Sequence, residues 1–304
     1  ILILCLLLGA CKNGNASSQN KSETSQDTIK AIKMPAIPQM MTAPEQRADF
    51  LAKHYWDNVN FADTNYIHHP EVTEQAWADY CDLLNHVPLE TAQQAMRNVI
   101  DRTNVDKKVF TYITDLADKY LYDPNSPMRN EEFYIPVLEA MIASPVLNET
   151  EKIRPQARLK LAQKNRIGTK ALNFTYTLAS GAQGSLYQLK AEYLLLFINN
   201  PGCQACTETI EGLKNAPIIN QLLQEKKLVL LSIYPDEELD EWKKHLSEFP
   251  NEWINGYDKK FTIKEEQVYD LKAIPTLYLL DKDKTVLLKD ATAPAIEAYL
   301  MQHQ

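Results

Sequence analysis

Glycine is scarce in this sequence, and its distribution excludes one class of fold for the first half of the chain. Only 8 of the 304 residues are glycine, and none lies between Gly14 and Gly168. Tight hairpin turns rely heavily on glycine, so a large β domain is not expected in this region. Apolar residues at helical spacing, such as Val109, Ile113 and Leu116, predict helices instead.

An excess of basic residues is also absent. The chain carries 32 Lys and Arg against 40 Asp and Glu, which gives a formal net charge of −8. Nucleic-acid binding requires a basic stripe that neutralises phosphates, and attraction to an anionic membrane surface requires a polybasic segment. We therefore expect no nucleic-acid partner and no electrostatic binding to membranes.

Cysteine is rare, with 5 residues, and the spacing of these residues argues against zinc. A zinc site needs four ligands, whereas the pair Cys203 and Cys206 supplies two and no second pair follows. His68 and His69 precede Pro70, and no further ligand recurs at useful spacing, so we expect them in a loop or helix cap. A glycine-rich phosphate loop and a nucleotide fingerprint are missing as well, so no bound metal or cofactor is expected.

Long apolar runs are limited to the start of the chain. Residues 1–10 are apolar but too few to span a bilayer, and they read as part of an export signal without its charged start. Leu8-Gly-Ala-Cys11 resembles a bacterial lipobox, which implies removal of residues 1–10 and lipid attachment at Cys11. An ordinary secretory signal with an incidental cysteine is the alternative. We expect a lipid-anchored protein of the cell envelope, facing the periplasm or on the outer-membrane surface.

The residues after the signal divide into a tether and a first folded domain. Residues 11–43 begin with a polar tract that cannot form a core, which predicts a flexible tether. Residues 44–165 predict a bundle of five or six helices. Pro88 and the segment Asn125-Ser-Pro127 are each expected to open a helix. Pro136 is expected to kink or interrupt its helix, and Pro155 is expected near the start of the last one.

One segment of the chain carries a chemical signature. An apolar run over residues 194–198 leads to Pro201-Gly202, and then Cys203-Gln-Ala-Cys206 opens a helical pattern. Such a pair at a strand-to-helix corner is typical of a redox site. Unpaired N–H groups and the helix dipole favour a thiolate, and cysteine pKa values in such motifs fall from about 8.5 to roughly 3.5–7.5. Cys203 is therefore the predicted nucleophile, and Cys206, one turn later, the predicted resolving cysteine.

These residues are part of a wider resemblance. Residues 166–304 resemble a thioredoxin-fold domain of the TlpA type, on the strength of residues 171–178, residues 184–189, the cysteine corner and Ile274-Pro-Thr-Leu-Tyr-Leu-Leu-Asp281. The resemblance implies an α/β domain with a mixed central sheet flanked by helices. It also implies that Pro275 is cis beside the cysteines and that the backbone of Ile274 holds an extended substrate. Implied partners are proteins with thiols or disulfides and a membrane electron donor.

Two positions depart from the thioredoxin pattern. Many thioredoxins place tryptophan before the first cysteine, where this chain has Gly202. Many also carry a buried acid or amide six residues before that cysteine, where this chain has Phe197. The group that would help to deprotonate the resolving cysteine is therefore missing from that position, which leaves the rate and direction of the reaction open.

The first domain has a resemblance of its own. Residues 48–64 resemble an uncharacterised helical domain that precedes thioredoxin-like domains in lipoproteins of Bacteroidetes. That family brings no known activity, and we expect its aromatic residues Tyr55, Trp56 and Phe61 in the core. Cys81 lies on the flank of an apolar helical face and is expected to be a small buried hydrophobe.

The sequence as a whole predicts a membrane-tethered thiol–disulfide oxidoreductase. Cys203 and Cys206 would exchange disulfides with partner proteins, and their own redox-active disulfide would be the only prosthetic element. The alternative is a non-enzymatic lipoprotein of the envelope, in which a structural disulfide between the two cysteines supports a binding scaffold.

Overall fold

The segment that precedes the first helix already contacts the helical domain. The structure is a computed structural model and describes residues 31–303. Residues 31–43 have no regular secondary structure, but Ile32 packs against the helical core and Asn58 Nδ2 donates a hydrogen bond to the Lys33 carbonyl at 2.9 Å. The predicted signal over residues 1–10, the predicted lipid site at Cys11 and the first part of the predicted tether lie outside the described residues.

Six α-helices make up the chain between Pro44 and Ala162, so the prediction of an all-α first domain is confirmed. Apolar residues at helical spacing, including Val109, Ile113 and Leu116, turn one side of each helix into a common core. The helices are α1 (Pro44–His54), α2 (Pro70–Leu84), α3 (Leu89–Arg102), α4 (Lys107–Ala117), α5 (Glu131–Ala143) and α6 (Glu149–Ala162).

The core of this domain is rich in aromatic side chains. The predicted core residues Tyr55, Trp56 and Phe61 are all buried. The ring of Trp56 lies 5.5 Å from that of Tyr80 and 6.1 Å from that of Trp77, centroid to centroid. Cys81 is buried in the same cluster, as predicted for a small hydrophobe. His69 occupies the N-cap position of α2, one of the two places expected for it, and its side chain makes no capping hydrogen bond.

The structure contradicts a helix start at Asn125-Ser-Pro127 and an interruption of the helix at Pro136. Asn125-Ser-Pro127 lies in a loop, and α5 begins only after Asn130, whose side chain accepts a hydrogen bond from the Phe133 amide. Pro136 lies inside α5 without ending it. A proline leaves the carbonyl four residues earlier without its helical partner, and here Gln93 Nε2 from α3 donates to that carbonyl, on Glu132, at 3.1 Å.

The last helix also differs from expectation at its proline. Pro155 lies in the interior of α6 rather than near its start. The helix begins instead at a capping box, in which the Asn148 side chain accepts from the Glu151 amide at 3.0 Å and the Glu151 side chain accepts from the Asn148 amide at 2.8 Å. These reciprocal bonds satisfy two of the unpaired groups at the helix end.

The second domain is built on one mixed sheet, which confirms the predicted fold class. The strand order is β2-β1-β5-β4-β3-β6-β7; β3 is parallel to β4 and β4 to β5, and the other pairs are antiparallel. The strands are β1 (Thr175–Leu178), β2 (Gln183–Ser185), β3 (Tyr193–Ile198), β4 (Leu228–Tyr234), β5 (Ile254–Tyr257), β6 (Thr276–Asp281) and β7 (Val286–Lys289).

Both faces of the central strands are covered, which explains why β3 reads as a continuous apolar run. Leu195 and Phe197 face a core formed with α7, α8 and α11, whereas Leu194 and Leu196 face the opposite core, which includes Phe174 of the lead-in segment. The helices of this domain are α7 (Gln204–Lys214), α8 (Pro217–Gln224), α9 (Leu239–His245), α10 (Thr262–Glu265) and α11 (Ala293–Gln302).

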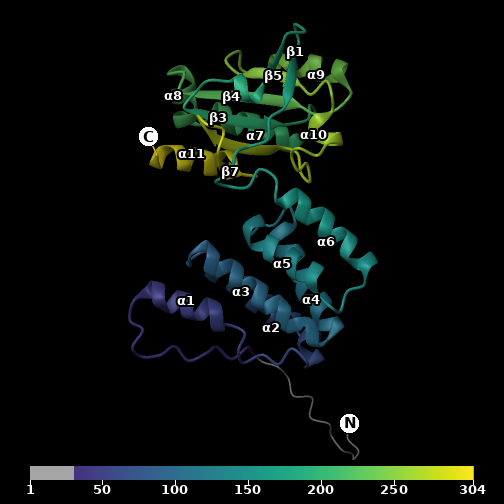
Figure 1. The fold of residues 1–304 in the computed structure, drawn as a ribbon. Helices are drawn as coiled ribbons and strands as arrows, with labels where there is room; N and C mark the ends of the chain where they lie inside the picture. The colour runs from purple at the N-terminus through teal and green to yellow at the C-terminus, as the bar shows by residue number, and fades with distance from the viewer. Residues whose placement is uncertain (1–30, 304) are drawn as a thin grey trace, which may run out of the picture.

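The two domains lie against each other through the β7 side of the sheet. Figure 1 shows α5 and α6 of the helical domain next to this side. At the junction, the buried side chain of Asn165 donates to the Val268 carbonyl and accepts from the Leu172 amide, both at 2.7 Å. Lys289 Nζ of β7 donates to the Lys164 carbonyl at 2.8 Å. The segment that connects the domains is therefore held to the second domain by hydrogen bonds of both Lys164 and Asn165.

Candidate functional site

Cys203 lies at the corner between β3 and α7, where its sulfur is partly exposed. It is the N-cap residue of α7, so it sits beside the unpaired N–H groups of the first helical turn. The preceding residue, Gly202, has a φ of +75°, a left-handed conformation that glycine adopts without strain. The tight turn through Gly202 thus places the predicted nucleophile at the positive end of a helix.

Cys206 lies one turn further into α7 and is buried, 2 % exposed. The pKa of its thiol is raised to about 12, chiefly by burial and in smaller part by the neighbouring Cys203. A single contact favours the thiolate form: the backbone N–H of Asn200 donates to the Cys206 sulfur at 3.5 Å. Both thiols are free in the structure. The contrast in exposure matches the predicted roles of attacking and resolving cysteine.

The predicted proline loop lies next to the cysteines. The Ile274–Pro275 peptide bond is cis, and the Cys203 sulfur lies 3.9 Å from the Ile274 carbonyl oxygen. The Ile274 amide donates no hydrogen bond to any residue between 31 and 303, and the side chain is partly exposed. The structure therefore brings together all four residues that the sequence assigned to this site.

The place of the missing acid is filled by an apolar contact. Phe197 is fully buried, and its ring meets that of Trp253 edge to face at 6.3 Å. An acid reaches the turn from the neighbouring strand: Asp236 follows β4 and accepts from Asn200 Nδ2 at 2.9 Å. Lys264 Nζ pairs with the same carboxylate at 2.7 Å.

The sequence reasoning missed this Asn200–Asp236 contact, although a signal existed. Asn200 follows β3 and Asp236 follows β4, and these strands are parallel neighbours. The carboxyl ends of parallel strands meet at one edge of a sheet, where binding residues gather. The contact holds the turn whose backbone donates to Cys206, so it acts on the resolving cysteine indirectly.

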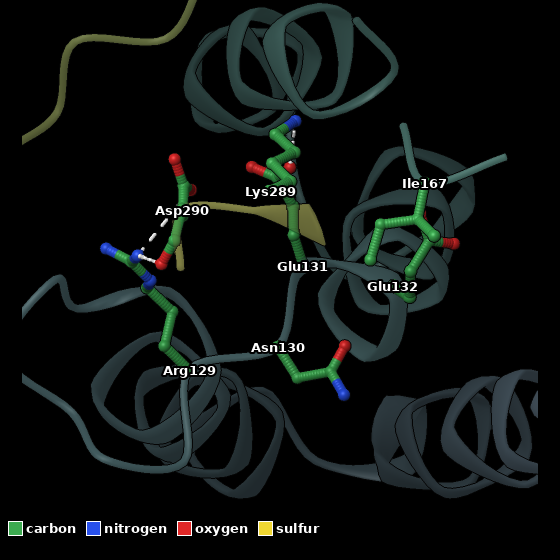
Figure 2. Close-up of a pocket in the computed structure, with 7 residues that line it drawn as sticks. All are labelled: Arg129, Asn130, Glu131, Glu132, Ile167, Lys289 and Asp290. Carbon is green, nitrogen blue, oxygen red and sulfur yellow. Dashed lines mark hydrogen bonds and ion pairs between the residues drawn. The ribbon is translucent and has the colours of Figure 1, made fainter. Parts of the chain in front are cut away.

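A buried cluster of charges joins the helical domain to the proline loop, and it too was missed. Lys272, three residues before Pro275, lies 2.9 Å from Glu131 at the start of α5, 3.2 Å from Asp270 and 3.4 Å from Asp290. Lys289 pairs with Glu131, as Figure 2 shows. Burial disfavours the charged form of Lys272, but the carboxylates outweigh it and raise the lysine pKa.

The described residues contain neither a metal centre nor a helix that could span a membrane. Within residues 31–303, no group of three or more His, Cys, Asp or Glu side chains is placed to hold a metal ion. None of the helices there combines the length and apolar character needed to cross a bilayer.

Two family models match different parts of the chain. Residues 10–165 match the model of a family described as a domain of unknown function, DUF5106. Residues 191–286 match the model of a family described as thioredoxin-like. No curated protein is similar to the chain at a significant level.

Among solved structures, one match covers most of the chain and others cover less than half of it. A thioredoxin-like protein from Bacteroides caccae is 84% identical, with a TM-score of 0.89 over 91% of this chain and 100% of that chain. The C-terminal domain of an uncharacterized protein from Bacteroides fragilis is 69% identical over 45% of this chain and 98% of its own, with a TM-score of 0.45. The thioredoxin domain of a thiol-disulfide oxidoreductase from Bacteroides vulgatus is 19% identical over 45% and 97%, with a TM-score of 0.41.

Proposed function

Since this chain belongs to the DUF5106 family and carries a thioredoxin-like domain behind its helical one, we propose that it is a thiol–disulfide oxidoreductase that acts on partner proteins. The observation that carries the proposal is the placement of Cys203. Cys203 is partly exposed at the N-cap position of α7, and its sulfur lies 3.9 Å from the carbonyl oxygen of Ile274, while Cys206 is buried one turn away. A structural staple has no need of an exposed thiol beside an unpaired backbone amide.

The proposed reaction is two successive exchanges. The Cys203 thiolate attacks one sulfur of a partner disulfide; the partner's S–S bond breaks, and its second sulfur leaves as a thiolate that takes a proton from water. The Cys206 thiolate then attacks the Cys203 sulfur and releases the partner's first sulfur as a thiol. The partner gains two electrons and two protons, and Cys203 and Cys206 end as a disulfide. In the reverse direction the same residues oxidise partner thiols.

Burial of Cys206 bears on the second exchange. The thiolate is the attacking species, and the pKa of Cys206 is raised to about 12 because the thiol is buried. Once Cys203 is engaged in a mixed disulfide, the Asn200 amide remains as the contact that favours the Cys206 thiolate. We propose that resolution, not the first attack, limits turnover, and that mixed disulfides with partners are long-lived.

The location and the electron donor belong to the same proposal. The lipobox-like residues up to Cys11 support a lipid-anchored protein of the cell envelope, where partner disulfides form and persist. A dithiol donor in the membrane would return the oxidised pair to the reduced state. The Ile274 amide and carbonyl would pair with the extended backbone around the partner's cysteine.

A trapping experiment tests the function. Cys206→Ala in the full chain should accumulate mixed disulfides with partner proteins in cells, visible on non-reducing gels and released by reductant. Cys81→Ala is the matched control, because that thiol is buried in the helical core. If Cys203 proves unreactive and the pair has a reduction potential below about −300 mV, the cysteines form a structural staple and the proposal fails.

A further inference from the structure

A groove opens beside Cys203, and the helical domain forms one of its walls. The cavity has a volume of about 520 Å³, within the range of ligand-binding clefts. One side is made by α7 and the proline loop, through Ala205 and Ile274 among others. The other side is made by Pro124, Asn125 and Arg129, which belong to the loop between α4 and α5.

This loop is rigid, so it forms a fixed wall. The Asn130 amide donates to the Leu121 carbonyl at 3.0 Å, which closes the loop at its base. Ser126 Oγ donates to the Tyr120 carbonyl at 2.6 Å and accepts from the Met128 amide at 3.2 Å. A wall whose backbone is already hydrogen bonded loses little conformational entropy when it contacts a ligand.

Contacts across the base of the groove fix the distance between its walls. Arg129 Nη2 of the helical loop donates to the Asp290 carbonyl at 2.6 Å, and the ion pair of Glu131 with Lys272 lies beside it. These contacts hold the helical domain against the segment that leads directly into Ile274 and Pro275. The groove is therefore a preformed slot rather than an open face.

The lining of the slot indicates what it binds. Small and apolar side chains dominate it, including Ala205, Gly212, Ala273 and Ala291. The charged lining residues are Arg129 and Asp290, which pair with each other, and Glu208, whose carboxylate accepts a hydrogen bond from Gln204 Nε2 at 2.9 Å. No free positive charge therefore faces the slot. Small side chains allow a peptide backbone to approach closely, and the unpaired Ile274 amide offers it a hydrogen bond.

We propose that this slot holds an extended, largely uncharged segment of the partner polypeptide next to its target cysteine, and that residues 123–129 of the helical domain contact that segment. The inference rests on the proposed function and assigns the helical domain a role in substrate selection. A disulfide in a flexible chain enters the slot, whereas one enclosed in a folded domain is excluded by the helical wall.

The experiment compares two activated disulfides with the same leaving group. One is a short unstructured peptide whose single cysteine is bound to thionitrobenzoate; the other is the free dithiobis-nitrobenzoate reagent. Asn125→Trp in the full chain fills the slot from the exposed tip of the helical loop. Asn65→Trp, on an exposed turn remote from the slot, is the matched control.

Asn125→Trp is expected to slow the peptide reaction at least about tenfold, equivalent to 1.4 kcal/mol of binding, while the free reagent reacts at the wild-type rate. Equal loss with both reagents, or no loss with the peptide, overturns the inference. Absence of any reaction at wild-type Cys203 refutes the proposed function instead, so the two failures are distinguishable.

A second measurement does not depend on that variant. In Cys206→Ala, the peptide is held on Cys203 as a mixed disulfide, and a benzoylphenylalanine two residues from its cysteine is activated by light. Cross-links to residues 123–129 support the helical wall. Cross-links confined to the thioredoxin-like domain overturn it.

Discussion

Removing Cys203 while keeping Cys206 isolates the resolving thiol and allows its ionisation to be measured. Burial is the largest cause of the raised pKa of Cys206, and it remains in Cys203→Ala, whereas the smaller contributions of Cys203 disappear. In this variant the pKa of Cys206 is therefore set by burial, which raises it, and by the hydrogen bond from the Asn200 amide, which lowers it.

The expected size of the effect follows from the pKa of about 12. Near pH 8, about one Cys206 thiol in ten thousand is ionised, compared with about a quarter for an ordinary cysteine of pKa about 8.5. A thiolate of higher pKa is a better nucleophile, so each ionised Cys206 reacts about 25–60 times faster than an ordinary thiolate and part of the deficit is offset. The folded Cys206 should therefore react about 40- to 100-fold more slowly than an ordinary thiol, and more slowly still because it is buried.

The assay is the rate of disulfide exchange with dithiodipyridine, with the labelled cysteine identified by peptide mapping. Cys203→Ala is measured folded and in guanidinium, so that the unfolded chain provides the reference for the same residue. The folded rate should also rise about tenfold per pH unit above neutrality, because the thiolate fraction does. The deficit of about 40- to 100-fold applies to the wild-type pKa, and loss of the smaller Cys203 contributions reduces it in the variant without removing the effect of burial. A folded Cys206 that reacts within about threefold of the unfolded one would therefore refute the reasoning.

Three further predictions concern stability and its dependence on pH. Lys272→Met leaves buried carboxylates short of a partner and should lower the free energy of unfolding by about 3–5 kcal/mol, measured by urea denaturation. Gln93→Met leaves the Glu132 carbonyl inside α5 without its donor and should cost about 1–3 kcal/mol in the same assay. Glu248 and Glu241 hydrogen bond to His245 and raise its pKa. The stability that these bonds contribute is fully present below the unfolded pKa of about 6.5 and is lost as pH rises through the higher folded pKa. His245→Gln should therefore make the free energy of unfolding depend less on pH over that range.

Matched variants separate these effects from general damage. Lys260→Met, Gln94→Met and His86→Gln alter exposed residues of the same types and should leave stability within about 0.5 kcal/mol of the wild type. If Lys272→Met is as stable as Lys260→Met, the interdomain cluster does not stabilise the fold. If Gln93→Met is as stable as Gln94→Met, the Glu132 carbonyl finds another donor. If His245→Gln leaves the pH dependence of stability unchanged, His245 does not contribute to it.

Local patterns carried the prediction of the cysteine site. Cys203 and Cys206 are three residues apart at the start of one helix, so a short stretch of sequence contains their chemistry. The roles of Ile274 and Pro275 followed from the resemblance to thioredoxin-fold domains. The same local rules failed at Pro136, because the donor that compensates for it comes from Gln93 on another helix. A helix breaker can be tolerated when tertiary structure supplies the missing bond.

The sequence by itself determined the helical class of the first domain, the position of the cysteine pair and the burial of the aromatic residues of the helical core, because these depend on periodicity, glycine content and short spacings. The α/β class of the second domain followed from its resemblance to thioredoxin-fold domains. Only the tertiary structure decided which groups surround the pair. Asp236 reaches Asn200 across two strands, and Glu131 meets Lys272 from a position 141 residues earlier. Such contacts are set by how strands and domains pack, and a chain read residue by residue does not contain that information.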